Sequence, residues 1–138
     1  MTLNEELDRI GAIAARHAGA DEHLAAVLVA EPTPGERLFL CAFVGAAGRT
    51  WLALDAQGAS VDARDRIREA LSIAAVCELA EESAGIADRT TPRVASPEYL
   101  DELGGSATTE IAVAVQQGLR AVEELVREVE AGYKLPLV

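Results

Sequence analysis

Aromatic residues are scarce in this sequence. Two phenylalanines, one tryptophan and two tyrosines make up 4% of the 138 residues, although half of the chain is apolar. The core must therefore be built from small and branched aliphatic side chains, which allow helices to approach one another closely. This composition is that of an ordinary globular chain, and we expect a single domain over residues 1–138.

Cysteines are equally few. Cys41 and Cys77 cannot build a disulfide framework, and each lies in an apolar run where a thiol behaves as a small hydrophobe. Neither has the CxxC spacing or the basic surroundings that lower a thiol pKa. We expect both to be reduced and buried.

Several motifs that identify enzymes are missing. The sequence contains no GxGxxG, GxxxxGK[ST], HExxH, GxSxG or paired CxxC. Their absence removes the phosphate-loop, zinc-protease, serine-hydrolase and zinc-ribbon interpretations that these motifs support. An enzyme without such motifs stays open, but no cofactor is expected.

Positive charge is also in short supply. Twelve basic residues face 23 acidic ones, which gives a formal net charge of −11. The resulting negative field opposes binding to nucleic acid and to anionic membrane surfaces. No apolar run reaches the roughly 18–20 residues that a membrane-spanning helix needs, and the first residues carry acids where a signal peptide would be basic. We expect a cytoplasmic protein without nucleic-acid or membrane partners.

The first half of the chain predicts one helix and one sheet. Residues 2–19 have a helical apolar period, with Thr2 as N-cap and Gly19 as terminator. Three apolar runs follow, at residues 23–31, 37–45 and 50–56, and glycine- or proline-containing turns separate them. We interpret these runs as a three-stranded antiparallel meander.

The second half predicts helices. A long helix is expected from a cap at Ser60 or Asp62 to about Gly85, with its acidic residues facing outward. After a surface connection, Ser96 caps a short helical turn that ends at Gly104. The predicted buried stripe of the long helix is Ile67, Leu71, Ala74 and Ala75, joined by Cys77 or Leu79.

A last helix is expected from Ser106 or Thr108 to Gly132, and an apolar tail follows it. Its apolar residues alternate four and three apart, as in a heptad seam, and Gly118 would allow a second helix to approach closely. The predicted fold is thus α+β, with an N-terminal helix, a three-stranded antiparallel meander, and two long helices with a short helical turn between them. The seam positions are Ile111, Val115, Gly118, Val122, Leu125 and Val129.

The strands predict self-association. A half-buried strand alternates apolar and polar residues, but LAAVLVA and LFLCAFV are continuous, so both sheet faces should be covered. Helices can cover both faces only if they divide between them; otherwise a face or a free strand edge must meet another chain. We expect a homo-oligomer, with a separate protein partner as a further candidate.

Few residues suggest chemistry. Glu78 and Glu82 share a helix face as metal-binding carboxylates would, but no histidine follows at the spacing of di-metal bundles, so a solvated face is favoured. His17 or His23 could act as a base only if it met a cysteine thiol. Neither arrangement predicts a defined reaction.

A pocket is the remaining candidate. Trp51 and Asp55 share one face of the third strand, so that a carboxylate beside an aromatic wall could line a small-molecule site. Asp55 could equally lie at the end of the strand, in solvent. Cys41 and His23 complete the predicted ligand-binding set, and no metal site is predicted.

Two functions follow from these observations. The leading hypothesis is a non-catalytic, homo-oligomeric accessory, regulatory or assembly module that acts through protein-protein contacts. The alternative is a small-molecule-binding protein or small enzyme, with its pocket between sheet and helix near Trp51 and Asp55.

Overall fold

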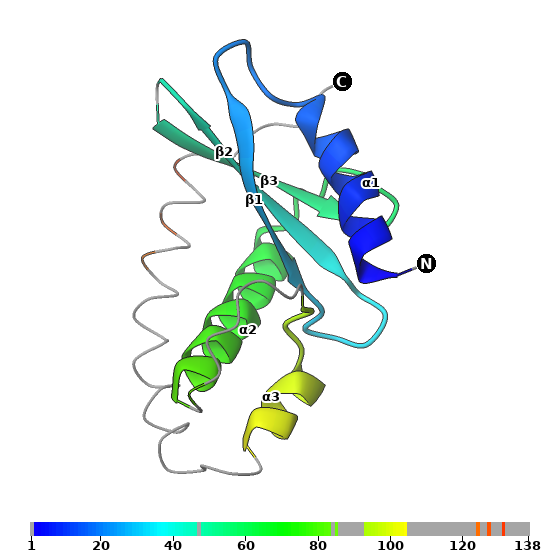
Figure 1. The fold of residues 1–138 in the computed structure, drawn as a ribbon, viewed down its shortest axis with the longest axis vertical. Helices are drawn as coiled ribbons and strands as arrows, with labels where there is room; N and C mark the ends of the chain where they lie inside the picture. Colours follow the sequence, from blue (N-terminus) through cyan, green and yellow to red (C-terminus); the bar gives the residue numbers. More distant parts are fainter. Residues whose placement is uncertain are drawn as a thin grey trace.

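The computed structural model describes residues 2–46, 48–83, 85 and 93–104, together with Glu124, Arg127 and Ala131. These residues form an α+β fold in which one helix precedes an antiparallel sheet and further helices follow it (Figure 1). The elements are α1 (Leu3–Ala15), β1 (His23–Ala30), β2 (Leu38–Gly45), β3 (Gly48–Asp55), α2 (Arg64–Ser83) and α3 (Pro97–Gly104). The predicted fold class is confirmed for this part of the chain.

Helix α1 begins as its sequence predicts. The Thr2 hydroxyl oxygen accepts a hydrogen bond from the Glu5 backbone N–H at 3.2 Å, which satisfies one of the free donors at the helix start. The helix ends at Ala15, earlier than the predicted Gly19. The chain tightens there into i to i−3 hydrogen bonds, such as that from the His17 N–H to the Ala14 carbonyl at 2.9 Å.

The three strands pair in the order β1-β2-β3, with both pairs antiparallel. This is the predicted meander. One irregularity lies in β1, where Ala25 is an extra residue between Leu24 and Ala26. Because a bulge shifts the side-chain alternation by one position, Leu24 and Val27 both pack on the same face of the sheet.

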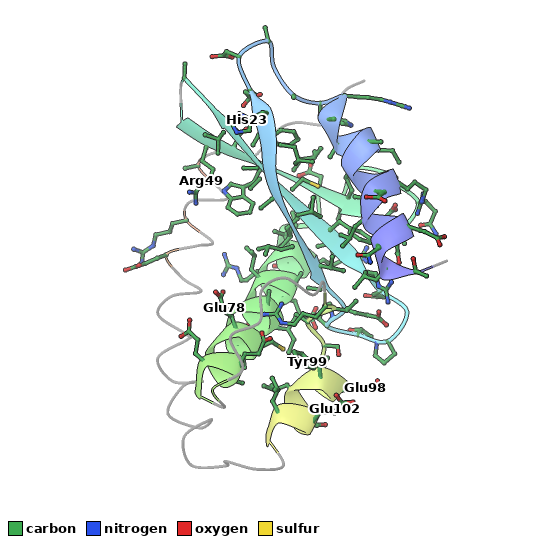
Figure 2. All side chains as sticks on the ribbon, in the orientation of Figure 1. His23, Arg49, Glu78, Glu98, Tyr99 and Glu102 are labelled. Carbon is green, nitrogen blue, oxygen red and sulfur yellow. The ribbon has the colours of Figure 1, made fainter. Side chains whose placement is uncertain are left out.

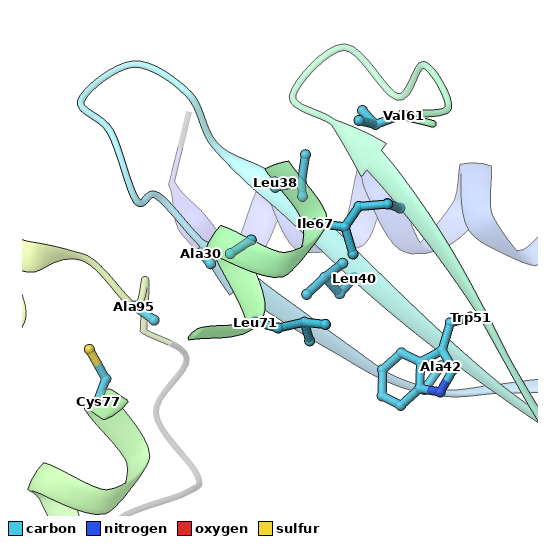
Figure 3. Packing of buried hydrophobic residues seen from close by; sticks show 12 residues of the cluster. Ala30, Leu38, Leu40, Ala42, Trp51, Val61, Ile67, Leu71, Cys77 and Ala95 are labelled. Carbon is cyan, nitrogen blue, oxygen red and sulfur yellow. The ribbon is translucent and has the colours of Figure 1, made fainter. Parts of the chain in front are cut away.

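Helices divide between the two faces of the sheet, which is one of the two ways of covering the continuous strands that the sequence left open. Helix α1 lies against one face and α2 against the other. Alternate residues of β2 therefore enter different cores. The core on the α1 face contains Ile10, Ala14, Val29, Phe39, Cys41, Phe43, Leu52 and Leu54. The core on the α2 face, shown in Figure 3, contains Ala30, Leu38, Leu40, Ala42, Trp51, Ala53, Val61, Ile67, Ala70, Leu71, Cys77 and Ala95.

Helix α2 begins at Arg64, and the predicted cap at Ser60 or Asp62 is wrong. Ser60 instead forms a bridge with Leu54, and the Val61 N–H donates to the Ala53 carbonyl at 2.9 Å. The chain after β3 thus folds back along that strand before it turns into the helix. Pairing with the sheet outweighs the capping preference of the serine side chain.

The segment before α3 also joins the sheet. Ala95 forms a parallel bridge with Ala30: its N–H donates to the Val29 carbonyl at 3.0 Å, and its carbonyl accepts from the Glu31 N–H at 2.8 Å. The sequence predicts only a surface connection here, so this backbone pairing is a correction. The predicted cap of α3 is confirmed, because the Ser96 hydroxyl oxygen accepts from the Tyr99 N–H at 3.1 Å.

Several predictions lie outside the described residues. These are the heptad seam with Gly118 and the apolar tail at residues 133–138; of the last predicted helix, only Glu124, Arg127 and Ala131 are described, and all three are helical. Among the described residues, no helix has both the length and the apolar composition to span a membrane.

Candidate functional site

The four residues predicted to bind a ligand lie in different parts of the sheet. Trp51 is buried on the α2 face, whereas Cys41 is buried on the α1 face. His23 is exposed at the end of the sheet that carries the β2-β3 turn, and Asp55 lies at the opposite end, where it pairs with Leu38. The sheet itself separates Trp51 from Cys41, so the four side chains do not line one common site. Their binding role stays a prediction.

Asp55 organises a turn. Its Oδ1 accepts hydrogen bonds from the backbone N–H groups of Gln57 and Ala59, both at 2.9 Å. An aspartate that binds backbone donors two and four residues ahead fixes the direction of the chain after a strand. One carboxylate oxygen is therefore already committed within the turn that leads to the Leu54–Ser60 bridge.

Both cysteines are free and buried, as predicted. Burial raises the pKa of the Cys41 thiol to about 12. Burial also raises the pKa of the Cys77 thiol, against smaller opposing effects of the Ser96 backbone and of the Arg93 charge. Since the thiolate is the reactive form, neither side chain is prepared for nucleophilic attack at neutral pH.

A partly buried polar cluster joins α2 to α3 and to the segment that leads into it, and we name it the Glu81 cluster. It consists of Glu81, Arg93 and Tyr99. Glu81 is 7% exposed, so the prediction that it faces solvent is wrong. Arg93 donates to Glu81 Oε1, and the Tyr99 hydroxyl donates to Glu81 Oε2 at 2.9 Å.

The remaining contacts of the Glu81 cluster are also attractive. The Arg93 guanidinium carbon lies 5.8 Å from the centre of the Tyr99 ring, within the range of a cation–π contact. Tyr99 belongs to α3, and its hydroxyl reaches Glu81 of α2 (Figure 2). Each carboxylate oxygen of Glu81 thus has a donor, and the Arg93 charge balances that of the carboxylate.

The protonation states of Arg93 and Tyr99 indicate a structural role for the Glu81 cluster and not one in proton transfer. The hydrogen bond to Glu81 is the largest cause of the raised pKa of Arg93. Burial, followed by the hydrogen bond to Glu81, raises the pKa of Tyr99. At neutral pH the tyrosine stays protonated and the arginine stays charged, so neither is positioned as a general base. The cluster holds α2 and residues 93–104 together.

The spacing of α2 contained a signal for Glu81. The buried stripe passes through Ile67, Leu71, Ala74 and Cys77, and one further turn brings it to position 81. Residue type suggested exposure, because acids are seldom buried without a partner. That partner, Arg93, lies in a segment without periodicity, so nothing in the sequence connected the two.

The second unusual feature is the free side of β1. This edge strand has the sequence HLAAVLVA, without charge or proline, and its first half is largely exposed. Ala25 and Ala26 are exposed, and Leu28, at 36%, is the one exposed large hydrophobic residue in the described part of the chain. The prediction that this run is buried on both faces is wrong for its first half, whereas β2 is buried along most of its length.

No group of three histidine, cysteine, aspartate or glutamate residues is arranged to hold a metal ion within the described part of the chain. Comparisons with protein-family models, with curated proteins and with solved structures find no match to this chain. The geometry of the Glu81 cluster and of β1 is therefore the basis for a functional proposal.

Proposed function

We propose that this chain is a non-catalytic module that acts through protein-protein contacts and associates with copies of itself, as an accessory, regulatory or assembly subunit. The observation that carries the proposal is the exposed apolar half of β1. Natural edge strands are protected from association by charges, prolines, bulges or covering segments. In β1 the protection is limited to the bulge at Ala25 and to the Ala95 bridge beside Ala30. Residues 23–30 carry neither charge nor proline, and the exposed Leu28 lies among them.

The buried chemistry of the chain supports the same proposal. The thiols of Cys41 and Cys77 are protonated at neutral pH because burial raises their pKa values. Glu81, the one buried charged residue in the described part of the chain, is paired with Arg93 and Tyr99. These groups stabilise the fold, and the exposed apolar strand is left as the feature that the fold itself does not explain.

The mass of the native particle tests self-association. We would measure light scattering during size-exclusion chromatography of the full chain over a wide range of loading concentrations. A stable multiple of 14.5 kDa is the expected result. A monomer at every concentration would contradict the proposed self-association.

One observation favours the alternative of a small-molecule site. The indole Nε1 of Trp51 is buried without a hydrogen-bond partner in the described structure. An unpaired buried donor costs about 1–3 kcal/mol. A ligand that carries an acceptor oxygen would satisfy this donor and lower that cost.

Fluorescence of Trp51, the single tryptophan, tests the alternative. We would titrate the protein with a panel of metabolites and follow the emission. A saturable change that Asp55→Asn weakens would support a pocket that involves both residues. This substitution removes the charge but keeps an oxygen that can accept from the Gln57 and Ala59 N–H groups. No change across the panel would count against the alternative.

A further inference from the structure

We infer that two copies of this chain associate through β1, whose open edge over residues 23–28 pairs antiparallel with the same residues of the second copy. The inference rests on the proposed self-association and adds the surface that carries it. Pairing of this kind would join two three-stranded sheets into one continuous six-stranded sheet. Three features of β1 support this interface: the direction of its backbone groups, the limits of its free edge, and its lack of charge.

Backbone groups of β1 point away from β2 at alternate residues, as in any antiparallel pair. The Val29 carbonyl and the Glu31 N–H face outward, because both bind Ala95. The same alternation directs the N–H and the carbonyl of Val27 to the outer side. In the described chain, no segment pairs with this side of β1 before Val29.

Residues 93–96 fix where a second copy can bind. They occupy the edge beside Ala30, so an added strand must end before Val29. Two-fold pairing is therefore centred on the bulge, in the exposed half of the strand. Because Ala25 is the extra residue there, Ala26 would lie opposite Ala26 of the second copy. The side chains of Ala26 and Leu28 would then extend the core of the α2 face across the dimer.

Charge limits where two copies of this chain can meet. The chain carries a net charge of −11, so two copies repel one another over most of their surface. Residues 23–30 contain no charged side chain, so repulsion is weakest there. A basic partner would be attracted to the acidic surfaces and would gain little from this strand. Identical antiparallel strands are also self-complementary about a two-fold axis, which gives a closed dimer.

Two lysine substitutions test the edge. Ala26→Lys and Leu28→Lys place a charge on the pairing strand, and Ala12→Lys adds the same charge at an exposed position of α1. Each lysine reduces the net negative charge, so weaker association cannot come from added repulsion between whole molecules. We expect roughly a tenfold or larger rise in the dimer dissociation constant for both edge variants, and no rise for Ala12→Lys. Circular dichroism checks that each variant is folded.

Disulfide trapping gives a second readout that does not require the edge to be disrupted. The native thiols are buried, so a cysteine at position 26 would be the exposed one. Antiparallel partners near a two-fold axis lie about 4.5–5.5 Å apart at Cα, within the range that a disulfide spans. We expect Ala26→Cys to form a covalent dimer under mild oxidation and Ala12→Cys to remain uncrosslinked.

The outcomes separate this inference from the proposed function. An oligomer that both edge lysines leave intact, and that Ala26→Cys does not crosslink, overturns the edge interface while self-association stands. A monomer at every concentration overturns both. A monomer whose β1 binds an added extended peptide would also overturn the second copy as the occupant. Loss of the dimer in both edge variants together with the Ala26→Cys crosslink supports the inference.

Discussion

Arg93→Ala measures how strongly the Glu81 cluster joins α2 to residues 93–104. The substitution leaves Glu81, 7% exposed, without its cation. Breaking a buried ion pair costs about 3–5 kcal/mol. The Arg93 side chain is 36% exposed, so water can partly replace it, and the Tyr99 hydroxyl still donates to the carboxylate. We therefore expect a loss of about 3 kcal/mol in the free energy of unfolding, which includes the lost contact with the Tyr99 ring.

Arg66→Ala is the matched control. Arg66 also pairs with a glutamate, Glu36, but the nitrogen and oxygen are 3.9 Å apart and the side chains are 46% and 55% exposed. Such surface pairs contribute about 0–1 kcal/mol. Urea unfolding followed by circular dichroism gives both free energies. A loss of 3 kcal/mol corresponds to a fall of roughly 10 °C in melting temperature for a domain of this size.

Equal losses in Arg93→Ala and Arg66→Ala would refute the assigned role of the Glu81 cluster. A further test is Glu81→Gln in the Arg93→Ala background. Removing the charge that lost its partner should restore part of the stability, because an unpaired buried charge costs more than a neutral amide. A second, additive loss would mean that the two side chains do not act as a pair.

Two further predictions concern pH and backbone geometry. The thiol pKa is 9.0 in its ordinary environment and about 12 for folded Cys41, so the unfolded state loses its proton first. The free energy of unfolding should therefore fall as pH rises from 9 toward 12, by up to about 1.4 kcal/mol per pH unit. An alkaline series of urea titrations checks this, and the free energy of unfolding of Cys41→Ala, compared at each pH, should fall less steeply. Gly58→Ala should lower the free energy of unfolding more than Gly35→Ala does in the same urea titrations. Both glycines have φ of 84°, but an added Cβ would meet Ile13 Cδ1 at 2.5 Å only at Gly58. Equal losses in the two variants would contradict this contact.

Local signals predicted much of the fold. The caps at Thr2 and Ser96 and the three apolar runs depend on the chain within a few residues, and each is found in the structure. The start of α2, by contrast, is determined by pairing of the preceding residues with strand β3. Ser60 has a side chain that could cap a helix, but its backbone bridges Leu54, and only the folded sheet provides that partner.

The candidate site was harder to predict because its residues come from separate segments. The hydrogen bond between Tyr99 and Glu81 joins residues 18 positions apart. Trp51 and Asp55 share a face by simple alternation, yet the Asp55 carboxylate is used within its own turn. Alternation along a strand gives the side of the sheet, and it does not give the hydrogen bonds that a side chain makes there.

Strand order is the information that the sequence lacked most. The runs in β1 and β2 are equally apolar, and composition alone predicted equal burial for both. The structure places β2 in the centre and β1 at an edge, so the same kind of sequence is covered in one strand and half exposed in the other. A central strand needs its apolar side chains to fill two cores. An edge strand of the same composition has fewer neighbours within its own chain, and a second copy paired along it would give Ala26 and Leu28 the neighbours that residues of β2 already have.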